Sequence, residues 1–349
     1  MTDLRSLVDL TAPIVLAPFG GLSSVALTAA VSNAGGLGSY GFYGYTGDRI
    51  RSTIDELRAA TDQPFAANIW LPTGEEVAPD AAHDAWARAL APFYAEVGIP
   101  VPPRPDQYLP SHDEQLDAIF AAAPAVLSIV YGVPDAATVE EAHRRGIRVV
   151  GTATTVPEAV ALAEGGVDAV VATGAEAAGH RVSFLREAER SLVGTIALVP
   201  QVVDAVAEWN IPVIAAGGIA DRRGVAAARA LGASGVQVGT AFLAAHESAA
   251  NKSHRYAIAH TAAHESVLTR AMSGRLARGA ENRVVREIEA SGSIAPFPAQ
   301  NWLTGQFRAP AGRQEKGELQ SLWLGQSAPL ARAVSATEVF AELAAGLRA

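Results

Sequence analysis

Residues 212–240 read PVIAAGGIADRRGVAAARALGASGVQVGT, and this stretch decides the fold. Two short apolar runs, Pro212–Ala216 and Gly235–Gly239, flank an Ala-rich amphipathic stretch that starts at Asp221. Short runs without polar alternation indicate strands that are buried on both faces, as in a parallel sheet. The stretch therefore predicts a strand–helix–strand unit in which Asp221 caps the helix.

The same alternation recurs from residue 13 to about residue 240. Six further strands are predicted at Ile14–Ala17, Leu37–Gly41, Phe65–Trp70, Ala125–Tyr131, Val149–Ala153 and Ala169–Thr173. The helices expected between strands include Ser23–Ala34, Asp48–Ala60, Asp135–Arg145, Val156–Glu164, Leu192–Trp209 and Asp221–Leu231. Eight strands in strict alternation with helices favour an α/β fold, a closed (β/α)8 TIM barrel, with a doubly wound open sheet as the alternative.

Two segments interrupt this repeat. An insertion at about 72–112 carries an expected helix near Ala81–Ala95 followed by a proline-rich stretch. Residues 246–292 look largely helical and polar, and 293–312 carry turn signals, so we expect 246–312 to form a mostly helical cap domain, here called the cap segment. The expected domains are thus a barrel over 1–245, the cap segment, and residues 313–349, which pack back on the barrel through a final helix at about Thr337–Leu347.

Composition limits the classes of function. Of the 349 residues, 49% are hydrophobic and 18% are charged, which is typical of a globular protein, and the net charge of −9 argues against a nucleic-acid partner. The chain has no cysteine, which excludes disulfides, thiolate metal sites and a cysteine nucleophile. His260 and His264 have helical spacing but lack the glutamate of a His-Glu-x-x-His motif, so no metal site is expected.

The first residues do not have the basic, apolar and small-residue regions of a signal peptide, and no apolar run reaches the ~18 residues of a membrane span. We therefore expect a cytoplasmic protein with no membrane partner.

In a barrel of this type, active sites form at the carboxyl ends of the strands. Gly217-Gly218 follows the seventh predicted strand, and Gly239-Thr240 follows the eighth and opens a helix. Glycine lets backbone N–H groups approach an anion, and helix N-termini favour negative charge. The paired loops predict a site for a phosphorylated ligand, although glycines that only permit tight turns are the alternative. No Gly-x-x-x-x-Gly-Lys-Ser/Thr element accompanies them, which argues against triphosphate chemistry.

Two polar side chains stand at other predicted strand ends. His180 lies in a glycine-bearing loop beside Gly179, where a neutral imidazole could accept a proton at physiological pH. Asn68 ends the third predicted strand, and its amide could hold the edge of a heteroaromatic ring. The alternatives are an ordinary loop histidine for His180 and a turn cap for Asn68.

Five separated motifs, in order, resemble the nitronate monooxygenase family, once called 2-nitropropane dioxygenases. The motifs are Ala17-Pro18-Phe19-Gly20-Gly21, Ala67-Asn68, Ala175-Glu176-Ala177-Ala178-Gly179-His180-Arg181, Pro212 through Asp221 and Gly235 through Leu243. The later Leu322-Trp323-Leu324-Gly325-Gln326 is also similar to that family's C-terminal region, so the resemblance covers about residues 12–345.

This resemblance implies a flavin mononucleotide (FMN) cofactor in a barrel with a cap. Members oxidise alkyl nitronates, and some nitroalkanes, with O2 to a carbonyl compound and nitrite. By resemblance, Pro18, Phe19 and Gly20 line the flavin and Asn68 contacts its ring. Thr173, Gly179, Gly217, Gly218, Gln237, Val238, Gly239 and Thr240 also belong to the implied cofactor site. His180 matches the family's catalytic base, which takes the α-proton of a nitroalkane or orients a nitronate.

The loop before His180 departs from the family pattern. Thr173-Gly174 stands where Gln-Gly is usual, and Ala178 replaces a glycine, so a different loop shape is expected if that glycine needed a positive φ. Two other functions stay open: an FMN-dependent NAD(P)H:quinone or enoyl reductase, and a non-redox barrel that binds a phosphorylated metabolite. The expected partners are a small-molecule substrate and O2, and a homodimer is allowed.

Overall fold

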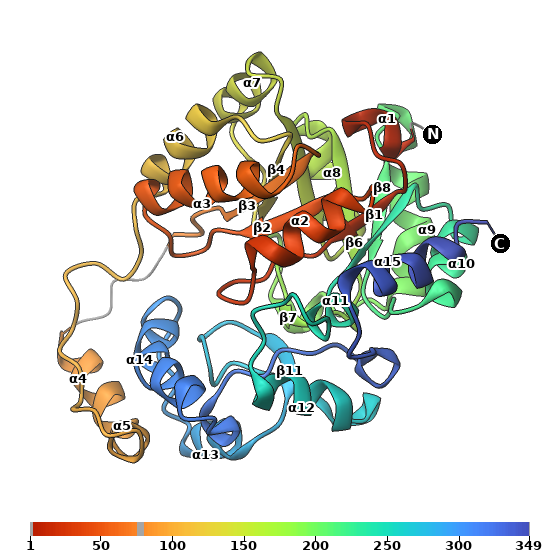
Figure 1. The fold of residues 1–349 in the computed structure, drawn as a ribbon. Helices are drawn as coiled ribbons and strands as arrows, with labels where there is room; N and C mark the ends of the chain where they lie inside the picture. Colours follow the sequence, from red (N-terminus) through yellow and green to blue (C-terminus); the bar gives the residue numbers. More distant parts are fainter. Residues whose placement is uncertain (1–2, 75–79, 349) are drawn as a thin grey trace.

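The computed structural model describes residues 3–74 and 80–348. Eight parallel strands form one sheet in the order β1-β9-β8-β6-β5-β4-β3-β2. A parallel bridge between Val15 and Leu37 joins the two ends of this order, so the sheet closes into a barrel (Figure 1). The (β/α)8 prediction is confirmed and the open sheet was wrong. The strands are β1 (Ile14–Leu16), β2 (Gly38–Gly41), β3 (Phe65–Trp70), β4 (Val126–Val130), β5 (Arg148–Ala153), β6 (Ala169–Thr173), β8 (Val213–Ala216) and β9 (Gly235–Val238).

Side chains alternate across the barrel wall. Ile14 and Leu16 pack outward in the core that the strands share with the surrounding helices. Val15, between them, points inward and packs with Val150 and Val171 in the barrel interior. Because both faces of the wall are covered, the strands carry the uninterrupted apolar runs seen in the sequence.

Helices surround the barrel, and Asp221 confirms its predicted role by accepting N–H groups of Arg223 (2.9 Å) and Gly224 (3.4 Å). The predicted helix Leu192–Trp209 is shorter, because it starts only after Gly194 and its last turn is a separate 3-10 turn that ends at the left-handed Asn210. The helix α6 was not expected from the sequence. The elements are α1 (Leu4–Val8), α2 (Val25–Asn33), α3 (Gly47–Ala60), α6 (His112–Ala122), α7 (Ala136–Arg144), α8 (Val156–Glu164), η1 (Ala188–Arg190), α9 (Thr195–Ala205), η2 (Ala207–Trp209), α10 (Arg222–Ala230) and α11 (Thr240–Leu243).

The insertion after β3 packs against α14 (Ala299–Arg313). Its predicted single helix is divided into α4 (Asp80–Ala89) and α5 (Ala91–Glu96), with Pro92 in the first turn of α5. Proline is tolerated there because first-turn N–H groups have no helical acceptor. Tyr94 donates its hydroxyl proton to the carbonyl of Leu303 (3.1 Å), which ties α5 to α14. Residues 75–79 of the insertion lie outside the described residues.

Residues 246–292 of the cap segment are less helical than expected, because they include two strands, whereas most of 293–312, where turn signals stood, forms the helix α14. The cap segment contains α12 (Lys252–His260), η3 (Ala263–Glu265), β10 (Ser266–Thr269), β11 (Ala277–Ala280), α13 (Arg283–Ser291) and α14. β11 pairs antiparallel with both β10 and the short strand β7 (Gly179–His180), which follows β6 of the barrel. The strands are only two to four residues long, and β7 pairs with a strand about a hundred positions away, so local periodicity gave no sign of this sheet.

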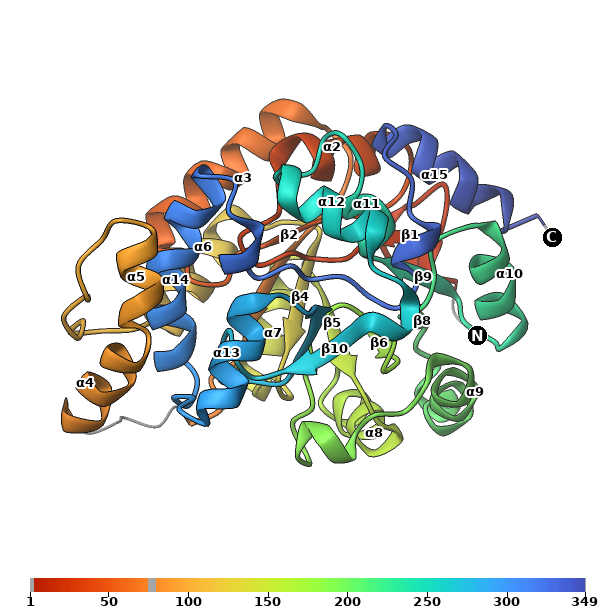
Figure 2. The same ribbon diagram turned by 90° about the horizontal axis from the view of Figure 1, so that it is seen from below.

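Figures 1 and 2 show α12, α13 and α14 together on one side of the barrel, with α4 and α5 beside α14. After η4 (Gly317–Leu319) and η5 (Ala328–Leu330), the chain ends in α15 (Ala336–Ala345), which packs against α2 and α10. An ion pair between Arg222 and Glu342 (2.8 Å) links α10 to α15. Within residues 3–74 and 80–348, no helix is long and apolar enough to cross a membrane.

Candidate active site

The two glycine loops predicted to bind phosphate lie next to each other. They follow β8 and β9, which are paired in register through Ala216 and Gln237. Gly218 has a φ of +73°, a conformation that favours glycine. In the described part of the chain, the N–H groups of Gly218 and Gly239 donate to no acceptor. These backbone donors and the start of α11 fit a phosphate group.

Three predicted side chains point into the barrel. Successive side chains of a strand point to opposite faces of the barrel wall. The neighbours Ala67, Ala172 and Val236 pack outward against the helices, so the side chains of Asn68, Thr173 and Gln237 point inward.

The Asn68 side chain is fixed by Ser128 of the neighbouring strand β4, because its Nδ2 donates to the carbonyl and hydroxyl oxygens of Ser128 (both 3.2 Å). Val238, by contrast, packs outward in the helix-facing core, so only its backbone faces the mouth.

The loop after β1 reaches the glycine loops that follow β8 and β9. The N–H of Phe19 donates to the Ser23 hydroxyl (3.2 Å), and the same oxygen accepts the N–H of Gly41 (3.0 Å). A Cβ added to Gly239 would lie 3.7 Å from Cε1 of Phe19. The segment Pro18-Phe19-Gly20 therefore borders the Gly239 loop.

His180 lies where the barrel meets the cap segment. Its strand pairing sets His180 opposite Ala277 of β11. Its Nε2 is 2.8 Å from the hydroxyl oxygen of Ser273. The rings of Trp70 and Trp323 flank the imidazole, with centroids 4.9 and 5.5 Å away. The histidine is thus fixed by a cap residue and walled by aromatic side chains.

The surroundings of His180 keep it uncharged. Burial, together with the positive charges of Arg275 and Arg308, lowers the pKa of His180 to about 3. The imidazole is therefore neutral at physiological pH, with one nitrogen able to accept a proton. A histidine with such a low pKa is a weak base. It therefore favours a substrate that has an acidic proton or that has already lost its proton.

Gly179, rather than Ala178, takes the special conformation in the loop that departs from the family pattern. Gly179 has a φ of +72°, whereas Ala178 is not among the residues with positive φ. A Cβ added at Gly179 would meet no atom within 4 Å, so the backbone there faces open space. The replacement of a glycine by Ala178 is thus compatible with the loop conformation.

Comparison with known proteins identifies the family. The family model described as nitronate monooxygenase matches residues 2–346. A probable nitronate monooxygenase of Staphylococcus saprophyticus is 36% identical over 340 residues, covering 96% of this chain and 94% of the relative. One from Staphylococcus aureus is 37% identical over 347 residues, covering 97% and 95%. The chain belongs to the nitronate monooxygenase family.

Solved structures agree with this family. The nitroalkane oxidase from Streptomyces ansochromogenes is 36% identical, with a TM-score of 0.88 over 99% of this chain and 98% of that one. FabK from Thermotoga maritima is 29% identical, with a TM-score of 0.76 over 100% and 96%. As a nitronate monooxygenase family member, the protein is an oxidoreductase, and its family supports the oxidation of nitronates.

The C-terminal motif shared with the nitronate monooxygenase family lies across the predicted site. The N–H of Gly325 donates to the hydroxyl of Thr240 (3.0 Å), and the N–H of Gln326 donates to the carbonyl of Glu176 (3.0 Å). A Cβ at Gly325 would lie 2.7 Å from that carbonyl oxygen, so only glycine allows this close approach. The motif thereby fixes Thr240 at the start of α11.

Several residues around His180 were missed. They are Tyr43, Trp70, Tyr131, Ser273, Arg275, Phe297, Arg308 and Trp323. Trp70 ends a predicted strand and Tyr131 ends another, so the rule that active sites form at strand ends could have found both. Tyr131 also has a φ of +73°, which costs on the order of 1–3 kcal/mol in a non-glycine residue and often marks functional sites.

Arg181 was also not identified as a site residue from the sequence. It is a buried cation beside the mouth of the barrel. It is 2% exposed, and its guanidinium donates to the carbonyls of Gly174 (2.7 Å) and Thr173 (3.0 Å). Burial lowers the pKa of Arg181 to about 10, which leaves it charged at neutral pH. It therefore adds positive charge at the end of β6.

Proposed function

We propose that this protein catalyses the FMN-dependent oxidation of alkyl nitronates by O2 to a carbonyl compound and nitrite. The observation that carries the proposal is the position of a neutral, anchored His180 at the mouth of a barrel that also presents two adjacent phosphate-fitting loops. Membership of the nitronate monooxygenase family supports the reaction type.

The described residues fit FMN. Its phosphate would lie against the unsatisfied N–H groups of Gly218 and Gly239 and the start of α11, at Thr240. Asn68 and Gln237 would face its ring, since both point into the barrel. The flavin, when bound, supplies the redox chemistry by accepting electrons from the substrate and passing them to O2.

The protein side chains orient the substrate and manage its proton. His180 is neutral and would accept the α-proton of a neutral nitroalkane, whereas a nitronate needs no such step. Trp70 and Trp323 flank the imidazole and would exclude water from the reacting carbon. The cap segment supplies Ser273, which holds the imidazole in place.

The visible absorption spectrum of the purified protein, followed by a nitrite assay with ethylnitronate, tests the proposal. A flavin spectrum and nitrite formation without NAD(P)H are expected. Rapid anaerobic bleaching of the flavin by NAD(P)H, with no nitrite, would instead establish the reductase alternative. A colourless protein that cannot be reconstituted with FMN would favour a barrel that binds another phosphorylated metabolite.

A further inference from the structure

The turn between β10 and β11 brings the hydroxyl oxygen of Ser273 to within 2.8 Å of Nε2 of His180. Two hydrogen bonds from side chains of α14, to the carbonyls of Ala271 (2.6 Å) and Met272 (2.5 Å), hold the first half of this turn. The second half, which contains Ser273 itself, is held by the side chain of Arg270.

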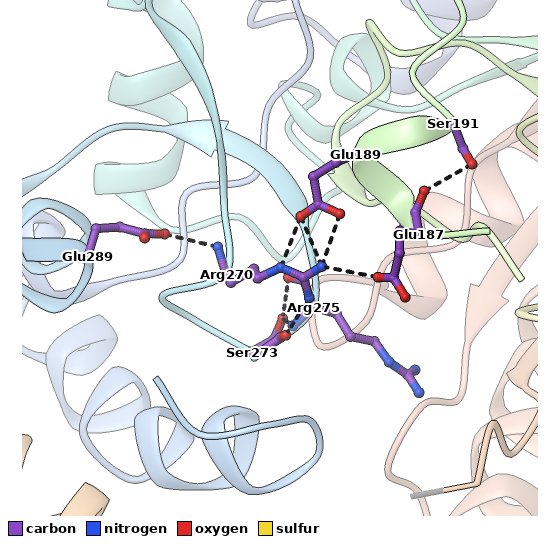
Figure 3. Close-up of polar contacts among 8 residues, drawn as sticks. Glu187, Glu189, Ser191, Arg270, Ser273, Arg275 and Glu289 are labelled. Carbon is purple, nitrogen blue, oxygen red and sulfur yellow. Dashed lines mark hydrogen bonds and ion pairs between the residues drawn. The ribbon is translucent and has the colours of Figure 1, made fainter. Parts of the chain in front are cut away.

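The Arg270 guanidinium joins the turn to the barrel. Its Nη1 donates to the carbonyl of Gly274 (3.0 Å), the residue after Ser273. Its Nε and Nη2 donate to the two carboxylate oxygens of Glu189 in η1 (both 3.1 Å), and a carboxylate oxygen of Glu187 lies 4.0 Å from Nη2. Figure 3 shows the guanidinium between these two carboxylates. A two-pronged contact between an arginine and a carboxylate fixes orientation as well as distance.

The main chain of Arg270 is anchored on the cap side. Its N–H donates to a carboxylate oxygen of Glu289 in α13 (3.0 Å), and its carbonyl accepts the N–H groups of Gly274 (2.8 Å) and Ser273 (3.3 Å). Gly274 has a φ of +82°, and an added Cβ would lie 2.5 Å from the amide nitrogen of Phe297. The turn is therefore tightly built around Arg270, and a change in the position of Arg270 is passed on to Ser273.

The turn contacts one barrel loop at two points. That loop runs from β6 to α9 and contains both His180, in β7, and Glu189, in η1. Ser273 contacts the loop at His180, and Arg270 contacts it at Glu189. Two contacts between the same pair of segments restrict their relative rotation more than one does. The contact at Glu189 therefore limits how far the Ser273 hydroxyl can move from the imidazole.

We propose that Arg270 is a positioning residue for His180, because its pairing with Glu189 keeps the Ser273 hydroxyl against the imidazole. The importance of this position for turnover rests on the function proposed above, in which His180 accepts the α-proton. The side chains of Arg270 and Glu189 are 37% and 48% exposed, so their ion pair adds little to the stability of the whole protein. Its effect is local and reaches His180 through Ser273.

Nitrogen NMR of the histidine-labelled, flavin-loaded enzyme tests the position of His180 without relying on turnover. Arg270→Gln should shift the imidazole signals of His180 toward those of Ser273→Ala. Glu189→Gln, which removes the same pair from the barrel side, should shift them in the same direction and replaces Arg270→Gln if that variant fails to fold. Arg270→Lys keeps the charge but not the fork, so its signals should lie between those of the wild type and Arg270→Gln.

Arg283→Gln is the matched control. Arg283 is similarly exposed (35%) and pairs with Glu96 (2.6 Å), but this pair joins α13 to α5 and leaves the β10–β11 turn untouched. The signals of His180 should therefore stay at their wild-type positions in Arg283→Gln. Unchanged signals in Arg270→Gln, or equal shifts in Arg270→Gln and Arg283→Gln, would overturn the proposal.

A double-mutant cycle shows whether Arg270 acts through Ser273. Arg270→Gln should lower kcat for 1-nitropropane by about three- to fivefold and change KM little, because exposed ion pairs contribute at most about that factor. In the Ser273→Ala background it should lower kcat no further, since the contact that it maintains is already lost. An equal loss in both backgrounds would mean that Arg270 does not act through Ser273, and the proposal would fail.

The two readouts separate this proposal from the proposed reaction. If the signals of His180 follow Arg270 but neither 1-nitropropane nor its nitronate yields nitrite, the positioning role stands and the proposed reaction fails. If nitrite forms while both the signals of His180 and kcat are indifferent to Arg270→Gln, the reaction stands and the positioning role fails.

Discussion

The Nε2 atom of His180 lies 2.8 Å from the hydroxyl oxygen of Ser273, and this contact decides which imidazole nitrogen is free. The Ser273 hydroxyl donates to the carbonyl of Arg275 (3.1 Å) and accepts the N–H of the same residue (3.3 Å). A hydroxyl has one proton, and a carbonyl can only accept. We infer from this arrangement that the hydroxyl proton goes to the carbonyl and that Nε2 of His180 is the donor, which leaves the Nδ1 lone pair to accept a substrate proton.

The variant Ser273→Ala should remove the hydrogen bond that fixes the Nε2–H tautomer of His180. We expect kcat for 1-nitropropane to fall by about tenfold, the loss of one hydrogen bond that orients the base, while turnover of the nitronate changes less. Nitrogen NMR of histidine-labelled protein should show His180 mainly as the Nε2–H form in the wild type and as a mixture in the variant. An unchanged tautomer in Ser273→Ala would contradict the assignment, and Ser273→Thr should restore the wild-type signal.

The barrel and the adjacency of its two glycine loops could be predicted because their signals are local. Each buried strand carries its own apolar run, and Gly217-Gly218 and Gly239-Thr240 directly follow two such runs. The parallel topology then brings the strand ends together without further information. The sheet register through Ala216 and Gln237 shows that this inference placed the two glycine loops correctly.

The environment of His180 could not be predicted in the same way. Ser273 and Arg275 lie in the turn between β10 and β11, and Arg308 lies in α14. These segments reach His180 only because β7 pairs with β11, a contact between residues about a hundred positions apart. Nothing in the local pattern around a single serine or arginine reports such a partner, so the aromatic and cationic walls appear only in three dimensions.

His180→Asn tests the base directly. The variant should keep FMN bound, because His180 is not one of the phosphate-loop residues, and kcat for neutral nitroalkanes should fall by roughly 100-fold or more, the usual contribution of a positioned general base. The turnover of preformed nitronate should fall much less, because this substrate has no α-proton for the base to remove. Parallel nitrite assays with 1-nitropropane and its nitronate measure both; undiminished nitroalkane turnover would remove His180 as the base.

Gly239→Asp should expel FMN. A carboxylate at the start of α11 would repel the phosphate from the N–H groups that are proposed to bind it. Gly239→Ala is the matched control, because Gly239 has a φ of −106° and an added Cβ would only touch Ala17 (3.5 Å) and Phe19 (3.7 Å). The flavin content, measured from the flavin and protein absorbance, should be near one per protein chain for Gly239→Ala and greatly reduced for Gly239→Asp. Stoichiometric flavin in the Asp variant would contradict the placement of the phosphate.

His254 should make the folded state sensitive to acid. It is 2% exposed and donates through Nε2 to the carbonyl of Trp323 (2.7 Å), and burial lowers the pKa of His254 to about 4. In the unfolded chain a histidine has a pKa of about 6.5. Above that pH neither state is protonated at this site. As the pH falls from about 6.5 to 4, the unfolded state binds a proton that the folded state does not, so stability decreases.

The expected size is about 1.4 kcal/mol of unfolding free energy per pH unit for each such histidine. Urea unfolding at pH values between 7.5 and 4.5 measures it. His254→Gln keeps a donor for the Trp323 carbonyl. It should reduce the slope of unfolding free energy against pH by the contribution of about one proton. His180→Asn should reduce it by a similar amount, because the pKa of His180 is also lowered. A His254→Gln slope equal to that of the wild type would show that His254 is protonated in the folded protein, which its burial beside Trp323 argues against.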